Sequence, residues 1–116
     1  MGETGELPYF RLGTRQVEVG VVVEVAGELD MAHAGEFAAG VRDQLTKGPV
    51  LLDLSELSFM DSSGVGALDG LLRVAEENGF QLRIQSDLHE NVKRVLDLTG
   101  MLAGLPLEDR HQRETT

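Results

Sequence analysis

The feature that most constrains the fold is a short apolar run, VLLDL at residues 50–54, with an amphipathic helical pattern on each side of it. A nearly continuous apolar run of this length is typical of a strand that is buried on both faces. Apolar residues recur at helical spacing from Ala34 to Leu45 before the run and from Val65 to Ala75 after it. A buried strand between two helices predicts βαβ crossovers and a largely parallel sheet.

Both helices have end signals, and further strands extend the pattern. We expect the first helix to end near Lys47-Gly48, before Pro49, and the second at Asn78-Gly79. Upstream, a valine at every second position over 17–25 indicates a strand, in which Gly20 marks a turn or a bulge. The other expected elements are a first strand around residues 10–12, a strand at 80–84, a helix at 88–99 stopped by Gly100, and a last short strand at 102–107.

The chain is therefore predicted to form a single α/β domain over residues 1–116, with a core at about 7–107 and flexible ends at 1–6 and 108–116. Its mixed, mostly parallel sheet should have about four or five strands, with helices packed against it. A length of 116 residues suits one domain with one modest core. Aromatic residues make up only 4% of the chain, so the core must consist mainly of Val, Leu and Ala.

Charge and composition narrow the classes of partner. Twenty acidic residues against ten basic ones give a formal charge of -10, which disfavours nucleic acid and anionic membranes and favours a monomer. A protein partner with a basic patch is compatible with this charge. There is no cysteine, which excludes disulfides and thiolate sites. No apolar run approaches the roughly 20 residues of a membrane span, and the N-terminus lacks a signal-peptide pattern, so we expect a cytoplasmic protein.

Two loops carry the candidate functional residues, because each follows a predicted strand and precedes a predicted helix. They are GELDMAHA at 27–34 and DSSGVG at 61–66. In α/β sheets, functional loops gather at the carboxyl ends of the strands. Asp and Ser are also common helix N-caps, so Asp30, Asp61, Ser62 or Ser63 could serve only as caps, with Gly64 easing a tight turn.

Catalytic interpretations find little support in the sequence. The serines lack the G-x-S-x-G spacing of a nucleophile elbow, and the Gly-Val-Gly lacks the spacing and the lysine of a P-loop. A serine nucleophile needs a histidine base, but the three histidines lie at two helix starts and in the tail. A phospho-aspartate site at Asp53 or Asp61 would need a nearby lysine, and Lys47 and Lys93 lie in helical segments. We therefore expect no enzyme, no metal and no cofactor.

Three segments together resemble a known family. GELD before a helix, SFMDSSGVGAL between a strand and a helix, and NVKRVLDLTGM near the end are similar to the motifs of a STAS domain. More closely, they resemble the stand-alone anti-sigma-factor antagonists of bacteria. The resemblance covers about Val17 to Leu107, which is most of the chain.

The resemblance implies a partner-switching function. Such antagonists bind an anti-sigma factor with serine kinase activity and thereby free a sigma factor. The kinase phosphorylates a serine of the D-S-S-G loop, which ends the binding, and a metal-dependent serine phosphatase reverses the modification. The implied phosphoacceptor is the serine before the glycine, here Ser63, with Ser62 as the alternative. The implied partner-binding residues are Asp30, Asp61, Ser62, Gly64 and Val65.

A phosphate in this loop could act locally. It adds about -1.5 to -2 charges and three acceptor oxygens, which a helix start tolerates but an interface built for a neutral hydroxyl does not. We also expect Gly64 and Gly66 to let a kinase approach the backbone closely. Phe59 and Met60 are expected to support the core or loop, although Met60 could be a partly exposed anchor.

His33 is a departure from the family pattern, because many relatives carry a small hydroxyl residue at this position. We expect a solvent-exposed residue at a helix start, with tuning of partner choice or pH response as the alternative. A second departure is the short charged tail, where many relatives have a longer final helix. The alternative function is a STAS module of a stressosome or of a lipid-transport complex, and an enzyme acting through Ser63 would be a third.

Overall fold

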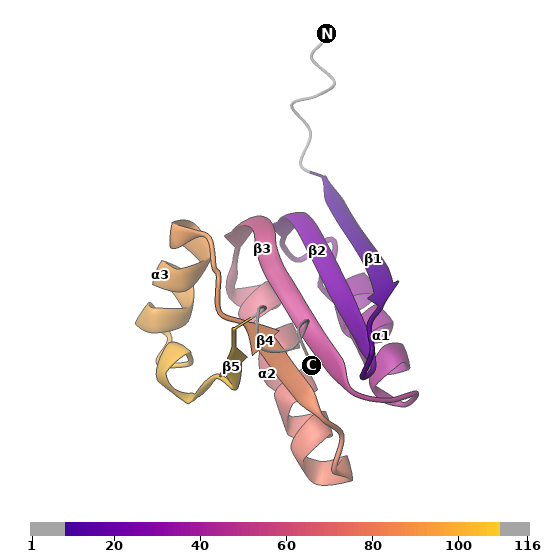
Figure 1. Ribbon diagram of the computed structural model, residues 1–116. Coiled ribbons are helices and arrows are strands. Elements are labelled where there is room, and N and C mark those ends of the chain that lie inside the picture. Colours follow the sequence, from indigo (N-terminus) through magenta and orange to yellow (C-terminus); the bar gives the residue numbers. More distant parts are fainter. Residues whose placement is uncertain (1–8, 110–116) are drawn as a thin grey trace, which may run out of the picture.

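The computed structural model describes residues 9–109 and shows a five-stranded sheet with helices packed against it (Figure 1). The strand order is β1-β2-β3-β4-β5, in which β1 pairs antiparallel with β2 and every other pair is parallel. The elements are β1 (Phe10–Gln16), β2 (Val21–Leu29), α1 (Ala34–Leu45), β3 (Val50–Met60), α2 (Ser62–Asn78), β4 (Leu82–Gln85), α3 (Glu90–Leu98), a 3-10 helix (Leu102–Gly104) and β5 (Leu107–Glu108).

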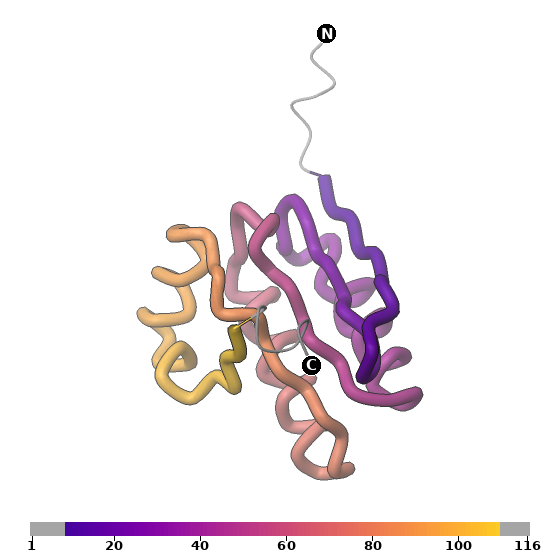
Figure 2. Tube along the Cα trace, viewed as in Figure 1, coloured from indigo at the N-terminus to yellow at the C-terminus, as the bar shows by residue number. Residues whose placement is uncertain are grey.

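This order confirms the predicted α/β class and the mostly parallel sheet. The chain makes three crossovers, in which α1, α2 and α3 each connect two neighbouring parallel strands (Figure 2). In the view of Figure 1, α1 and α2 lie behind the sheet and α3 lies beside β4 and β5. Among the residues that the structure describes, no helix is both long and apolar enough to cross a membrane.

Several predicted boundaries need correction. The valine-rich segment is interrupted at Gly20, which has a φ of 92° and forms the turn between β1 and β2, so Val17 and Val19 lie outside the strands. The predicted last strand at 102–107 is a 3-10 helix followed by a two-residue strand. That strand includes Glu108, which pairs with Gln85 although it was predicted to be in a flexible end. The predicted flexible residues 1–6 and 110–116 lie outside the described residues.

The two predicted glycine stops end their helices as expected. Gly79 follows α2 with a φ of 71°, and its backbone N–H donates to the Ala75 carbonyl oxygen. Gly100 has a φ of 80° just after α3, and its N–H donates to the Asp97 carbonyl oxygen at 3.0 Å. Both residues adopt the left-handed conformation that favours glycine, so the chain can leave each helix sharply.

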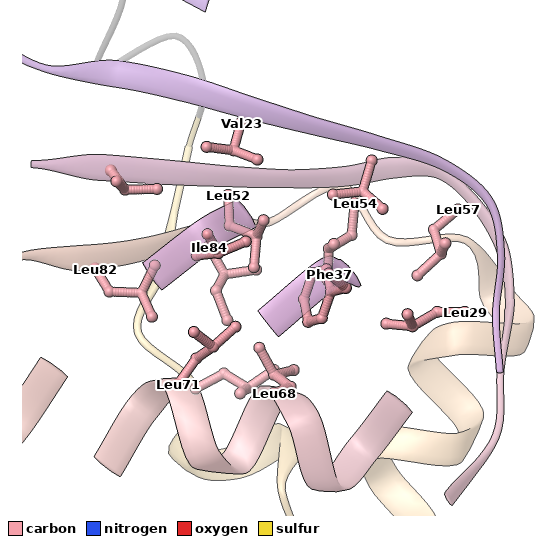
Figure 3. Close-up of a cluster of buried hydrophobic side chains, with 14 of the residues drawn as sticks. Val23, Leu29, Phe37, Leu52, Leu54, Leu57, Leu68, Leu71, Leu82 and Ile84 are labelled. Carbon is pink, nitrogen blue, oxygen red and sulfur yellow. The ribbon is translucent and has the colours of Figure 1, made fainter. Parts of the chain in front are cut away.

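The core lies between the sheet and the helices. Val50–Leu54 is buried on both faces, as predicted. On the helix-facing side, Phe37 of α1 lies between Leu54 of β3 and the α2 residues Leu68 and Leu71 (Figure 3). The core is mainly aliphatic and Phe37 is its one phenylalanine among the fully buried residues described, which agrees with the low aromatic content.

The strand β3 is longer than predicted, because it continues through Met60 into the segment that was expected to be a loop. Its register with β2 shifts twice, between Glu24 and Ala26 and again between Gly27 and Glu28. The residues of β3 that join the core are Val50, Leu52, Leu54, Leu57 and Met60, so their spacing changes from two to three at the shifts. Each shift inserts an extra residue in β3 and thereby changes which side chains face the core.

We predict that Phe37→Ala lowers the free energy of unfolding by about 3–5 kcal/mol, because it removes a fully buried aromatic ring. Phe59→Ala is the matched control, since the Phe59 side chain is exposed and its removal should cost about 1 kcal/mol or less. Urea unfolding monitored by circular dichroism measures both values. Similar losses for the two variants would contradict this assignment of the core.

Candidate functional site

The two predicted loops meet at one edge of the sheet. β2 and β3 are parallel neighbours, and the last residue of β2, Leu29, is paired with the last residue of β3, Met60. Immediately beyond this pair, the Asp61 backbone N–H donates to the Leu29 carbonyl oxygen at 3.2 Å. The GELD and DSSG segments are therefore joined by the sheet itself, as expected for loops at the carboxyl ends of parallel strands.

Asp61 is the N-cap of α2. The sequence alone had left Asp61, Ser62 and Ser63 as possible caps of this helix. Its backbone is extended, and its Oδ1 accepts hydrogen bonds from the N–H groups of Ser63 at 2.9 Å and Gly64 at 3.1 Å. These bonds satisfy two of the backbone donors that a helix start leaves free. Ser62 and Ser63 are accordingly the first two residues of α2, held in a fixed backbone conformation.

The two serine hydroxyls differ in exposure. Ser62 is exposed, and Ser63 is partly exposed. Within residues 9–109, neither hydroxyl takes part in a hydrogen bond. Both therefore remain available at a helix N-terminus, where the helix dipole favours negative charge.

Gly64 and Val65 complete the first turn of α2 and face inward. Val65 is partly buried against the core, and its N–H donates to the Asp61 carbonyl oxygen at 3.0 Å. Gly64 is buried, and a Cβ atom on it would lie 2.8 Å from Met60 Cγ and 2.9 Å from both Leu29 Cγ and the Leu29 carbonyl oxygen. Gly64 thus allows the start of α2 to pack directly on the ends of β2 and β3, an internal role that the sequence prediction missed. Gly66 is exposed, with no such neighbour within 4 Å.

Asp30 organises the other loop rather than capping α1 with its side chain. Its Oδ1 accepts a hydrogen bond from the Ala32 N–H at 3.0 Å, and its carbonyl oxygen accepts from the N–H groups of His33 and Ala34. The N-cap position of α1 is occupied by His33, whose side chain makes no capping bond.

His33 differs from its predicted environment. Only 26% of its side chain is exposed, so the expectation of a solvent-exposed residue is wrong. Its Nδ1 lies 3.0 Å from Asp30 Oδ1, and its ring stacks on Phe10 with ring centroids 5.1 Å apart and an interplanar angle of 13°. The stacking partner comes from β1, more than twenty positions earlier, which is why the local sequence could not reveal it.

The two residues before Asp61 do not both behave as predicted. Met60 is buried, so it supports the core and is not a partly exposed anchor. Phe59 is 42% exposed and does not serve as a core residue. Met31, which sequence reasoning did not single out, follows Asp30 and is 79% exposed. Phe59 and Met31 therefore expose apolar surface next to the GELD and DSSG segments.

The described residues include neither a cluster of metal ligands nor a histidine hydrogen-bonded to a serine. Within residues 9–109, no group of three His, Asp or Glu side chains could hold a metal ion. His33 Nδ1 contacts Asp30, His89 Nδ1 accepts a hydrogen bond from the Asn91 N–H, and among the described residues no hydrogen bond joins either ring to a serine hydroxyl. Lys47 lies in the turn just after α1 and pairs with Asp43 of that helix at 3.3 Å. His111 lies outside the described residues.

Comparisons with known proteins agree with the geometry. The family model described as "STAS domain" matches residues 12–113. The "Anti-sigma F factor antagonist" of Paenibacillus polymyxa is 28% identical over 100 residues, which cover 83% of this chain and 84% of the relative. The "Anti-sigma-B factor antagonist" of Bacillus subtilis (strain 168) is 30% identical over 93 residues, which cover 79% of this chain and 84% of the relative.

The chain also resembles a solved anti-sigma factor antagonist, SpoIIAA, in two forms. With the unphosphorylated form, the sequence identity is 25%, the match covers 85% of this chain and 87% of SpoIIAA, and the TM-score is 0.68. The structure described as the Bacillus cell fate determinant SpoIIAA in the phosphorylated form is 25% identical, covers 85% and 90%, and has a TM-score of 0.63. The two forms superpose on this fold about equally well.

We predict that Gly64→Ala lowers the free energy of unfolding by about 1–3 kcal/mol, because the added Cβ overlaps Met60 and Leu29 at the ends of β3 and β2. Gly66→Ala is the control in the same helix. It meets no atom and should raise the free energy of unfolding by about 0.5–1 kcal/mol through helix propensity. Equal changes in the two midpoints of chemical unfolding would show that Gly64 does not have this packing role.

Proposed function

The chain belongs to the STAS domain family, and from that membership we propose that it is an anti-sigma factor antagonist, which binds an anti-sigma factor and so releases a sigma factor. The observation that carries the proposal is the paired-loop geometry, in which the GELD and DSSG segments join at the ends of β2 and β3. A pair of loops fixed by a sheet suits recognition of a protein surface, because little conformational freedom is lost on binding.

The docking surface lies at the ends of β2 and β3, where the GELD and DSSG segments meet. Asp30 and Asp61 each use a carboxylate oxygen to hold their own loop, and both remain partly exposed. Ser62 and Val65 belong to the first turn of α2, and Gly64 sets the position of that turn on the sheet. We assign these five residues to partner binding, Gly64 through the position that it gives the first turn of α2. Two carboxylates and a net charge of -10 favour a basic patch on that partner.

The binding is switched off by phosphorylation of Ser63, with Ser62 as the alternative acceptor. Supporting this assignment, the Ser63 hydroxyl has no hydrogen bond among the described residues, and its backbone N–H is held by Asp61. The similar protein SpoIIAA has been solved in a phosphorylated form. The anti-sigma factor supplies the kinase activity, and a metal-dependent serine phosphatase restores the free hydroxyl.

The proposed function requires only binding from this chain. It acts by binding and not by catalysis, and it uses neither a cofactor nor a metal of its own. It works in the cytoplasm as a monomer, without contact to nucleic acid or membrane. Its acidic charge supports these assignments, because phosphate backbones and anionic lipid surfaces would repel it.

We predict that incubation with ATP and the anti-sigma-type serine kinases of the same host adds one phosphate to the chain, mapped to Ser63. Intact-mass spectrometry followed by peptide mapping measures the gain. Ser63→Ala should abolish it, while Ser62→Ala, the neighbouring control, should retain it.

Phosphate on Ser62 alone would move the acceptor by one residue. If no kinase modifies either serine, the phosphorylation switch is wrong, and a STAS module that binds another partner becomes the better account. A binding assay with the same kinases then decides whether the antagonist function itself survives.

A further inference from the structure

We propose that His33 is a positioning residue for Asp30: it fixes the orientation of the Asp30 carboxylate in the docking surface and thereby strengthens binding of the anti-sigma factor. This inference rests on the proposed function for its consequence and on the contacts of His33 for its mechanism.

The two carboxylate oxygens of Asp30 have different surroundings. Oδ1 receives both the Ala32 N–H and His33 Nδ1, each at 3.0 Å. Oδ2 takes no hydrogen bond within the part of the chain that the structure describes. One oxygen is therefore held by the loop from two directions, and the carboxylate has one preferred orientation. The side chain remains 27% exposed, so the group stays accessible to a partner.

The contact between His33 and Asp30 requires a proton on one of the two groups. An ionised carboxylate only accepts hydrogen bonds, so the proton lies on His33 Nδ1 and is donated to Asp30 Oδ1. In a neutral imidazole this selects the Nδ1–H tautomer, because the hydrogen bond of one ring nitrogen decides where the proton resides. The tautomer is thus a direct spectroscopic signature of the positioning contact.

Contacts with the first strand keep the imidazole of His33 from rotating away. Its ring stacks on Phe10, which is paired with Gly27 in the sheet. Beside this pair, the Glu28 N–H donates to the Tyr9 carbonyl oxygen at 2.8 Å. The His33 backbone is held as well, since its N–H donates to Asp30 and its carbonyl oxygen accepts from Phe37. The first strand therefore contributes to the docking surface through one aromatic contact.

A matched pair of variants separates hydrogen bonding from packing. His33→Asn places an amide donor where Nδ1 lies and loses the ring, whereas His33→Phe keeps a stacking ring and loses the donor. In titrations of the host kinase that binds the wild-type chain, we expect His33→Asn to stay within about threefold of the wild-type Kd and His33→Phe to weaken binding about tenfold. In an Asp30→Ala background, His33→Phe should cause no further loss.

Wild-type affinity of His33→Phe would overturn the proposal, and so would a loss of the same size in the Asp30→Ala background, because either result makes the donor irrelevant to Asp30. Thermal unfolding of each variant identifies any that fail to fold.

A second measurement needs no partner. Long-range ¹H–¹⁵N spectra at about pH 9, where an imidazole is neutral, should show His33 as the Nδ1–H tautomer in the wild-type chain and as Nε2–H in Asp30→Ala. An Nε2–H tautomer in the wild type would refute the positioning contact. If no kinase binds the wild-type chain, the proposed function fails, yet the spectra still decide whether His33 holds Asp30.

Discussion

The pairing of Leu29 with Met60 is the constraint on which the rest of the site depends. It aligns the ends of two parallel strands, so that the loop after each strand leaves the sheet at the same place. Gly64 completes the junction, because only a residue without a side chain lets the start of α2 reach Leu29 and Met60. Ser62, Ser63 and Asp30 are therefore placed by the hydrophobic core, and burial of these apolar side chains stabilises the geometry of the proposed docking surface.

This arrangement makes a local switch physically reasonable. The serines begin a helix whose cap is already satisfied by Asp61, so added negative charge there does not compete with the bonds that hold the backbone. The same charge in an interface faces two carboxylates and a large desolvation cost. A change of a single side chain can thus alter binding while the fold of the domain stays the same. The proposed positioning contact of His33 with Asp30 lies in the same surface and is present in the unmodified protein.

Sequence patterns predicted the elements well where local chemistry decides them. The apolar run Val50–Leu54, the αL glycines after α2 and α3, and the capping role open to Asp61 all follow from side chains acting on their own backbone. The prediction failed where a long-range pairing decides. The two register shifts against β2 accompany the extension of β3 to Met60, and they leave Phe59 exposed while Met60 is buried as expected. Period-two reasoning cannot anticipate an inserted residue. The stacking of His33 on Phe10 and the close packing of Gly64 against Leu29 and Met60 also join residues far apart in the chain. Local sequence patterns therefore could not predict them.

The measurement that tests the central claim most directly is the Kd of the cognate anti-sigma factor for the unmodified chain and for the chain carrying phosphate on Ser63, determined by titration calorimetry under identical conditions. The account predicts that the phosphate weakens binding by about 100-fold, which corresponds to roughly 3 kcal/mol. The same Kd for both forms would contradict the claim that this helix start is a phosphorylation-controlled docking surface.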